Sequence, residues 1–192
     1  MTDSAKKGFY FNQDDCIGCK ACQIACKDKN DFEVGTMFRH VTSYMQGTYP
    51  DVLMYHYSAT CNHCEKPACV AVCPNSAMYI DDEDGTVQHD DTNCIGCGYC
   101  VQACPYGVPQ VIDSLSRKCD ACKPLRAAGE QPACVAACPL RALDFGSFDE
   151  LAAAHPDAVN KIAILPDPET SPCTLVEAKA AALEEGYQEV IL

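Results

Sequence analysis

Four tight groups of cysteines constrain this chain more than any other feature of its sequence. Each group has four members, so together they account for sixteen of the 17 cysteines and leave only Cys173. The groups are Cys16, Cys19, Cys22 and Cys26; Cys61, Cys64, Cys69 and Cys73; Cys94, Cys97, Cys100 and Cys104; and Cys119, Cys122, Cys134 and Cys138. The third group has the bacterial ferredoxin spacing Cys-x-x-Cys-x-x-Cys-x-x-x-Cys-Pro, which holds [4Fe-4S] clusters.

Disulfides and zinc are the alternative uses of so many cysteines. Disulfide-rich small proteins are usually secreted, and residues 1–15 contain no apolar run typical of a secretion signal. Three cysteines within residues 94–100 suit a shared metal centre better than separate disulfides. Zinc binds paired Cys-x-x-Cys units, but such a triplet followed by a fourth cysteine and a proline suits a tetrahedral zinc site poorly. The sequence therefore predicts four [4Fe-4S] clusters.

Composition narrows the classes of partner and activity. The formal net charge is -13 and thiolate-held clusters add to it, so no nucleic acid partner is expected. No run approaches the ~18–20 apolar residues of a membrane-spanning helix, which predicts a protein that is soluble or peripheral to the cell membrane. We find no nucleotide-binding motif and no nucleophile–base constellation. The chain is therefore not expected to be an enzyme on its own.

The direction in which each cysteine points from its loop or helix decides which cluster it can ligate. In two-cluster ferredoxins the fourth cysteine of a motif ligates the other cluster, because it lies on the following helix and is directed away from its own loop. Short strands that flank the second and third motifs are predicted at 53–57, 77–80, 86–89 and 108–112. They group these two motifs in one module. The first and fourth motifs then form the other module, which brings a strand at 9–11 near one at 143–145.

The expected ligand sets follow from this pairing. They are cluster 1 at Cys16, Cys19, Cys22 and Cys138; cluster 2 at Cys61, Cys64, Cys69 and Cys104; cluster 3 at Cys94, Cys97, Cys100 and Cys73; and cluster 4 at Cys119, Cys122, Cys134 and Cys26. The alternative is sequential pairing, first motif with second and third with fourth. It would leave the long stretch between Cys26 and Cys61 inside a module.

Several residues near the motifs have a simpler interpretation than a direct role. His63 lies within the second motif, but with sixteen cysteines available we expect packing rather than ligation. Lys20, Lys66 and Arg117 could tune cluster potentials, although solvated side chains are the simpler interpretation. Cys173 is expected to be a free thiol.

The predicted fold class is α+β, with two ferredoxin-like modules, one inserted in the other, and a C-terminal extension. Module A comprises residues 1–48 and 113–146, module B residues 49–112, and the extension residues 147–192. A hairpin is predicted within residues 38–58.

Two capping boxes predict helices in the C-terminal extension. The box at 147–150 predicts a short helix, and the box at 174–177 predicts a helix that runs to Glu185. We expect both helices to serve packing or docking.

Four stretches carry a resemblance to a known family. They are Cys61-Asn-His-Cys-Glu-Lys-Pro-Ala-Cys, Cys94-Ile-Gly-Cys-Gly-Tyr-Cys, Cys104-Pro-Tyr-Gly-Val-Pro-Gln and Cys138-Pro-Leu-Arg-Ala-Leu-Asp-Phe-Gly. They resemble the electron-transfer subunit of dimethyl sulfoxide reductase and, more broadly, the four-cluster subunits of molybdopterin oxidoreductases. Nitrate reductase-like members replace one third-motif cysteine with tryptophan. Cys97 occupies that position here, which favours the four-cubane branch.

The resemblance implies a function and partners. Such a subunit passes single electrons between a donor and a large molybdenum- or tungsten-pterin catalytic subunit, often with a membrane anchor subunit, in a bacterial complex. The molybdopterin cofactor is then expected only in the partner. Members of this family are exported on a partner's signal, so the sequence does not decide the side of the membrane. The alternative is a stand-alone polyferredoxin that shuttles electrons.

Overall fold

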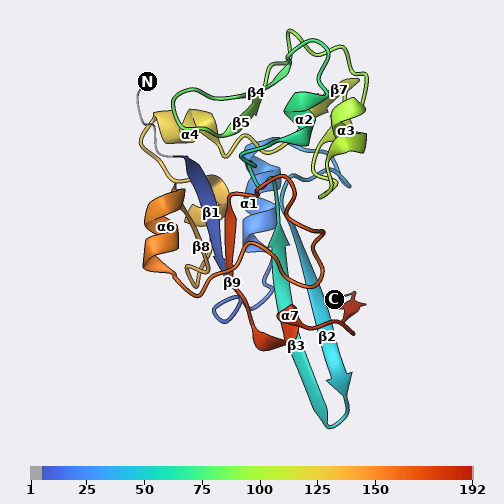
Figure 1. Cartoon of the computed structure of the whole chain (residues 1–192), viewed down its shortest axis with the longest axis vertical. Helices are drawn as coiled ribbons and strands as arrows, with labels where there is room; N and C mark the ends of the chain where they lie inside the picture. The colour runs from blue at the N-terminus through green and yellow to red at the C-terminus, as the bar shows by residue number, and fades with distance from the viewer. Residues whose placement is uncertain (1–5, 192) are drawn as a thin grey trace.

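The chain folds around a three-stranded sheet whose central strand is β1 (Lys7–Asn12). The structure, a computed structural model, describes residues 6–191 (Figure 1). β8 (Leu143–Ser147) pairs antiparallel with one edge of β1, and β9 (Thr174–Glu177) pairs parallel with the other. Phe9 of β1 is fully buried, so the aromatic run that predicted this strand anchors the core. The pairing of β1 with β8 confirms the predicted approach of these segments.

A long hairpin forms a second sheet. β2 (His40–Thr48) and β3 (Asp51–Ala59) pair along their whole length, which confirms the hairpin predicted within residues 38–58. β10 (Gln188–Val190) adds to the free edge of β2. The end of the hairpin near Tyr57 is buried in the core, whereas its tip projects away from the body of the molecule (Figure 1).

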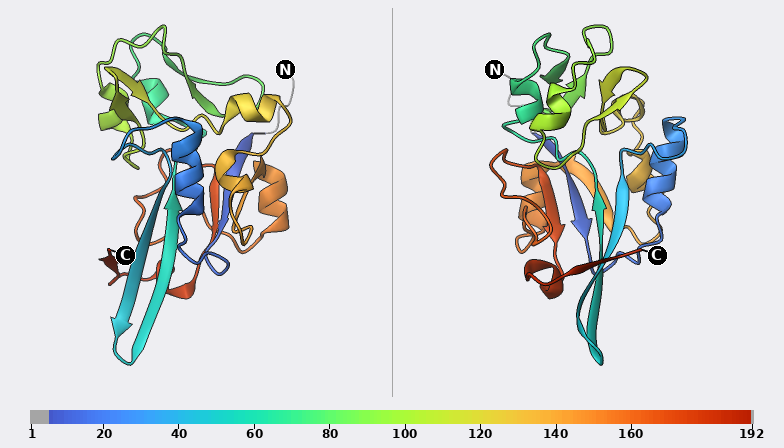
Figure 2. Two further views of the ribbon diagram at one scale, coloured as in Figure 1. Left: turned by 180° about the vertical axis from the view of Figure 1, so that it is seen from behind. Right: turned by 90° about the vertical axis from the view of Figure 1, so that its right-hand side faces the viewer.

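Two short strand pairs lie beside the second and third cysteine motifs. β4 (Met78–Ile80) and β5 (Val87–His89) flank an acidic turn, which confirms the predicted strand, turn and strand. β6 (Gln110–Ile112) pairs with β7 (Leu115–Arg117). The strand expected at 108–112 is therefore shorter than predicted and pairs with the strand that follows it. The two views in Figure 2 show these elements gathered at the end of the molecule opposite the hairpin tip.

Short helices accompany the cysteine motifs. In chain order the helices are α1 (Ala21–Lys29), α2 (Ala68–Ala71), α3 (Tyr99–Ala103), α4 (Lys123–Ala127), α5 (Ala133–Ala136), α6 (Phe148–Ala154) and α7 (Ala180–Leu183). α1 packs against α5, and α2 packs against α3. The first motif therefore lies beside the fourth, and the second beside the third. Among the described residues, no helix has both the length and the apolar character needed to cross a membrane.

The C-terminal segment differs from its prediction at one of its two capping boxes. The box at 147–150 does open a helix, α6. The box at 174–177 does not, and the prediction of a helix from there to Glu185 is wrong. Those residues form β9, whose Leu175 and Val176 are buried, and only the short α7 follows. The free edge of β1 provides backbone partners and a buried environment for apolar residues, which outweighs the local capping pattern.

Candidate metal centres

Three pockets in the described part of the protein are each lined by four cysteines. Each pocket combines three cysteines of one motif with one of another: Cys16, Cys19 and Cys22 with Cys138; Cys61, Cys64 and Cys69 with Cys104; and Cys94, Cys97 and Cys100 with Cys73. In each pocket the fourth cysteine lies just after the end of a helix of the other motif. The structure thus brings together the residues expected for clusters 1, 2 and 3.

The cysteines of the fourth expected set are also neighbours. Cys26 lies on α1 and Cys134 on α5, the two helices that pack together. Burial raises the pKa of the Cys26 thiol to about 11, and the charges of Cys134 and Cys122 contribute to the rise. Burial also raises the pKa of Cys119, and the charge of Cys26 adds to that rise. These four sulfurs therefore occupy one electrostatic neighbourhood.

One backbone feature recurs in all four motifs. The residue two positions after the first cysteine has a positive φ and turns its amide toward that cysteine's sulfur. These residues are Gly18 (φ 68°), His63 (43°), Gly96 (66°) and Ala121 (52°). The N–Sγ distances are 3.5, 3.4 and 3.4 Å in the second, third and fourth motifs. In the first motif the hydrogen bond from the Gly18 amide lowers the pKa of Cys16, although burial raises it by more. Amide donors favour the thiolate, which is the metal-binding form.

The donor set fits an iron–sulfur cluster better than a single ion. Burial raises the pKa of the Cys69 thiol to about 12, so four such sulfurs become thiolates together only beside a metal. Within residues 6–191, no three His, Cys, Asp or Glu side chains converge closely enough to hold one ion. Cysteines arranged around a pocket, rather than at a point, suit a multi-iron cluster more than tetrahedral zinc.

Two buried cations lie beside these cysteines, and the sequence did not single them out. Arg39 is 1% exposed and Lys118 is 4% exposed. The Lys118 ammonium donates to the carbonyl oxygens of Val87 and Cys119. The position of Lys118 directly before the fourth motif was a usable signal. Arg39 lies between motifs, at the start of the hairpin, where no local pattern marks it.

The cations that the sequence did single out are in less enclosed places. Lys66 is exposed, and Lys20 is partly exposed. Arg117 donates to the carboxylate of Asp91 at 2.7 Å, and both side chains are partly exposed. Water screens such charges, so their influence on the cysteine pockets is weaker than that of Arg39 or Lys118.

His63 and Cys173 are both buried. The Nδ1 atom of His63 accepts a hydrogen bond from the amide of Val87 at 3.1 Å, as expected for a packing residue. Burial, with the nearby charge of Lys118 next in effect, holds the pKa of His63 well below its usual value. Cys173 is 1% exposed and does not line the three cysteine pockets.

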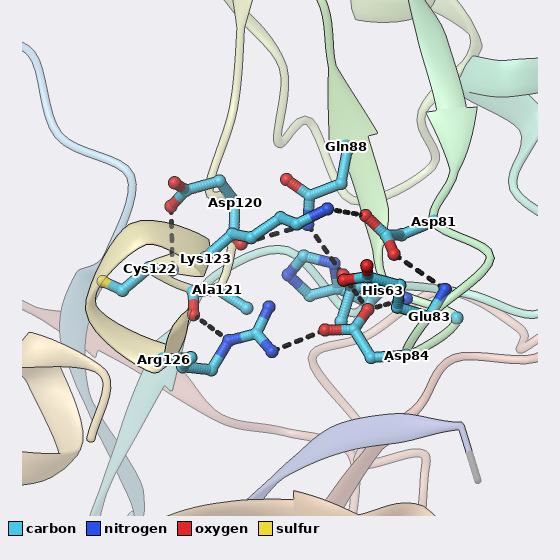
Figure 3. Close-up of polar contacts among 12 residues, drawn as sticks. His63, Asp81, Glu83, Asp84, Gln88, Asp120, Ala121, Cys122, Lys123 and Arg126 are labelled. Carbon is cyan, nitrogen blue, oxygen red and sulfur yellow. Dashed lines mark hydrogen bonds and ion pairs between the residues drawn. The ribbon is translucent and has the colours of Figure 1, made fainter. Parts of the chain in front are cut away.

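A polar network connects the β4–β5 turn to the fourth motif (Figure 3). Asp81 pairs with Lys123 and Asp84 pairs with Arg126, so two of the four acidic residues of the turn contact α4. A further bond runs from the side chain of Gln88 on β5 to the carbonyl of Asp120, at 3.1 Å. We call these three contacts the turn–α4 clamp. The clamp joins the segment between the second and third motifs to the fourth motif.

The comparisons with known proteins identify iron–sulfur domains in this protein. A family model described as a 4Fe-4S dicluster domain matches residues 52–148, and one described as a 4Fe-4S binding domain matches residues 13–34. The B subunit of the anaerobic dimethyl sulfoxide reductase of Escherichia coli (strain K12) is 46% identical in an alignment 160 positions long that covers 78% of each protein. The B subunit of the same reductase from Haemophilus influenzae is 38% identical in an alignment 190 positions long that covers 93% of this protein and 92% of the relative. Protein NrfC of Escherichia coli (strain K12) is 38% identical over 152 residues, 77% of this protein and 68% of the relative.

Proposed function

This protein belongs to the family of iron–sulfur subunits of dimethyl sulfoxide reductases, and on that premise we propose that it is the electron-transfer subunit of a molybdopterin oxidoreductase. When bound, [4Fe-4S] clusters supply one-electron transfer. The protein's own residues hold those clusters and leave the catalysis to a partner. The observation that carries this proposal is the repeated pocket with three cysteines from one motif and one from another.

We propose the exchanged ligand sets for all four clusters. Set 1 is Cys16, Cys19, Cys22 and Cys138; set 2 is Cys61, Cys64, Cys69 and Cys104; set 3 is Cys94, Cys97, Cys100 and Cys73; set 4 is Cys119, Cys122, Cys134 and Cys26. The pockets support the first three sets. The packing of α1 against α5 supports the fourth.

A Cys73→Ser variant tests whether the fourth cysteine of a motif ligates the neighbouring cluster or the cluster of its own loop. With exchanged sets, the cluster lost or altered is the one that Cys94→Ser also removes, because both cysteines belong to set 3. Anaerobic EPR spectra of the two variants should therefore lack the same signal. Cys64→Ser is the matched control from the same motif as Cys73. If Cys73→Ser instead loses the signal that Cys64→Ser loses, the exchanged assignment is wrong.

The nested module arrangement belongs to the same proposal. Module A (1–48 and 113–146) holds sets 1 and 4, and module B (49–112) holds sets 2 and 3. The β1–β8 pairing and the two helix pairs support it. Residues 147–192 form the extension, from which β9 adds to the sheet of module A.

The order of the sets follows from their neighbours. Cys22 and Cys26 are one turn apart on α1, which places set 1 next to set 4. The charge of Cys61 contributes to the raised pKa of Cys119, after burial and Cys26, so set 4 adjoins set 2. Helix α2 carries Cys69 of set 2, and Cys73 of set 3 follows just after it, so set 2 lies next to set 3. The proposed order is therefore 1, 4, 2, 3.

The two ends of this order reach the surface. Cys19 of set 1 and Cys97 of set 3 are exposed, and each is two residues from an isoleucine that is 62% exposed, Ile17 and Ile95. A redox partner can approach either end closely. We propose that one end faces a large molybdenum- or tungsten-pterin catalytic subunit and the other faces the donor, such as a membrane anchor subunit. Because the donor side is then at a membrane, the subunit is peripheral to it.

Co-purification tests the partner. The tagged protein, isolated anaerobically from its native cells, should bring down a large subunit together with molybdenum or tungsten. A control strain that lacks pterin cofactor synthesis should yield the protein without either metal. If the protein carries iron but neither metal follows it, and it runs as a monomer at micromolar concentration, it is the stand-alone polyferredoxin instead.

A further inference from the structure

Arg39 is a buried cation whose protein contacts leave three of its five N–H donors unused. Its side chain is fully buried. One nitrogen, Nη1, donates to the carbonyl oxygen of Ser58 at 3.1 Å and to its hydroxyl at 3.0 Å. The other two, Nε and Nη2, are buried and have no partner in the protein. A buried, partly unpaired guanidinium is costly unless negative charge lies close to it.

No carboxylate forms an ion pair with Arg39 among the described residues. Its guanidinium carbon lies 4.9 Å from the centre of the Phe9 ring, a contact that partly offsets the loss of water. By contrast, the Lys118 ammonium, which is also buried, has two carbonyl acceptors. Arg39 therefore requires another source of compensating charge.

The cysteines around Arg39 come from sets 1 and 4. The Ser58 hydroxyl that accepts its hydrogen bond also lies 3.4 Å from the sulfur of Cys22. The main-chain amide of Arg39 donates to the sulfur of Cys26. Arg39 therefore lies beside cysteines of both sets.

We propose that Arg39 is the shared counter-charge of the clusters held by sets 1 and 4, and that it raises the reduction potential of both. This inference rests on the proposed function. Each [4Fe-4S] cluster gains one negative charge on reduction, and a fixed positive charge in a low-dielectric interior stabilises the reduced form more than the oxidised form. No proton or group is transferred. Arg39 is therefore a positioning and tuning residue rather than a ligand.

The test is an anaerobic redox titration followed by EPR, with the full-length protein in its native complex. Arg39→Met removes the charge and keeps much of the volume, whereas Arg39→Lys retains the charge. We expect the Met variant to lower the midpoint potentials of two of the four clusters, with at least one reduction equilibrium constant falling about tenfold, or ~59 mV for one electron. The Lys variant should stay close to the native values.

Arg141→Met is the matched control. Arg141 is exposed and donates to the carbonyl oxygen of Cys138, a member of set 1, so its substitution removes a solvent-screened charge beside the same set. The four potentials of this variant should match the native ones. Unchanged potentials in Arg39→Met, or an equal shift in Arg39→Lys, would overturn the proposal, because charge would then not be the cause.

Measuring the iron content first separates a change in potential from a loss of clusters. It also separates failure of this inference from failure of the proposed function. If the native protein lacks [4Fe-4S] clusters, the proposed function fails before Arg39 is examined. If Arg39→Met and Arg39→Gln lose the iron of sets 1 and 4 while Arg39→Lys keeps it, the counter-charge is needed even for assembly, which supports the proposal. Equal iron loss in Arg39→Lys would contradict it.

Discussion

At the scale of single residues, the cysteine loops depend on a backbone conformation that few side chains favour. The third motif meets this requirement with two glycines of positive φ, Gly96 (66°) and Gly98 (73°). Only the first of them is also enclosed. A Cβ atom at Gly96 would lie 2.1 Å from the carbonyl oxygen of Ser114, whereas one at Gly98 would meet no atom within 4 Å.

This pair of glycines provides a matched prediction. Gly98→Ala should cost about 1–2 kcal/mol of folding free energy, the cost of a left-handed conformation alone. Gly96→Ala should cost about 3–5 kcal/mol, at the upper end of single-residue effects, because the backbone at Ser114 must also move. Anaerobic denaturant titration of the two variants measures the difference. Equal losses would show that the close approach at Gly96 has no effect.

Cys173 provides a second prediction at this scale. Burial raises the pKa of its thiol to about 12, so at pH 8 only on the order of one thiol in 10,000 is the reactive thiolate. The folded holoprotein should therefore resist alkylation at Cys173 until the pH nears 12. The unfolded protein should be alkylated at Cys173 at once. Cys173→Ala should keep the native iron content, whereas Cys69→Ala should lose iron. Iron loss in Cys173→Ala would make it a ligand.

The cysteine groupings could be predicted because they depend on reach along a few residues. Spacing alone decides that Cys104, after a helical turn, is directed away from the loop that carries Cys94. Arg39 could not be predicted in this way. It becomes significant only because the hairpin brings it beside α1 and α5, and no local pattern records that contact.

At the scale of elements, the turn–α4 clamp links the segment of the second and third motifs to the fourth motif. The pair Arg126–Asp84 is its most enclosed part, with both side chains 10% exposed. Burial alone would raise the pKa of Asp84, but hydrogen bonds from Thr86 and Arg126 outweigh it and lower the pKa. The contribution of the Asp84 carboxylate to the free energy of unfolding is therefore complete above the unfolded pKa of about 3.9. It is lost as the pH falls through the lower pKa of the folded state.

Arg126→Met tests the clamp. It leaves the Asp84 carboxylate enclosed without its cation, so we expect the free energy of unfolding at pH 7 to fall by about 3 kcal/mol. Lys161→Met is the control, because Lys161 and Asp167 form an exposed pair worth less than about 1 kcal/mol. Denaturant titrations of both holoproteins provide the comparison. If the free energy of unfolding falls no more in Arg126→Met than in Lys161→Met, the clamp does not stabilise the protein as proposed.

The elements also show where sequence reasoning reaches its limit. The strand–turn–strand of β4 and β5 and the long hairpin were predictable, since turn residues and runs of strand-favouring residues are local signals. β9 was not. Its capping-box pattern indicates a helix locally, but residues 174–177 find a parallel partner in β1, more than 160 residues earlier in the sequence. Parallel pairing over such a separation leaves no local signature.

At the scale of the whole molecule, the core itself contains proposed cluster ligands. The main buried group of apolar residues includes Cys22, Cys61, Cys119, Cys134 and Cys138, and a smaller one beside β4 and β5 includes Cys69 and Cys100. Burial disfavours the thiolate forms of these cysteines unless a metal lies beside them. The cores of both proposed modules are therefore complete only with their clusters.

Removal of iron should consequently unfold the protein. Anaerobic treatment with an iron chelator should abolish the near-UV circular dichroism signal and expose the hairpin and the β1 sheet to protease, because cluster binding energy is also folding energy. Untreated holoprotein carried through the same steps is the control. An iron-free protein that keeps native protection would show that its sheets and helices suffice alone.

The central claim is that sixteen cysteines hold four [4Fe-4S] clusters in this protein. The most direct measurement is quantitative analysis of iron, acid-labile sulfide and zinc in the anaerobically purified native protein, corrected for any clusters of its partner. We predict about sixteen irons and about sixteen sulfides per polypeptide, four of each per cluster, with no stoichiometric zinc. About four zinc ions per polypeptide and no labile sulfide would contradict the account.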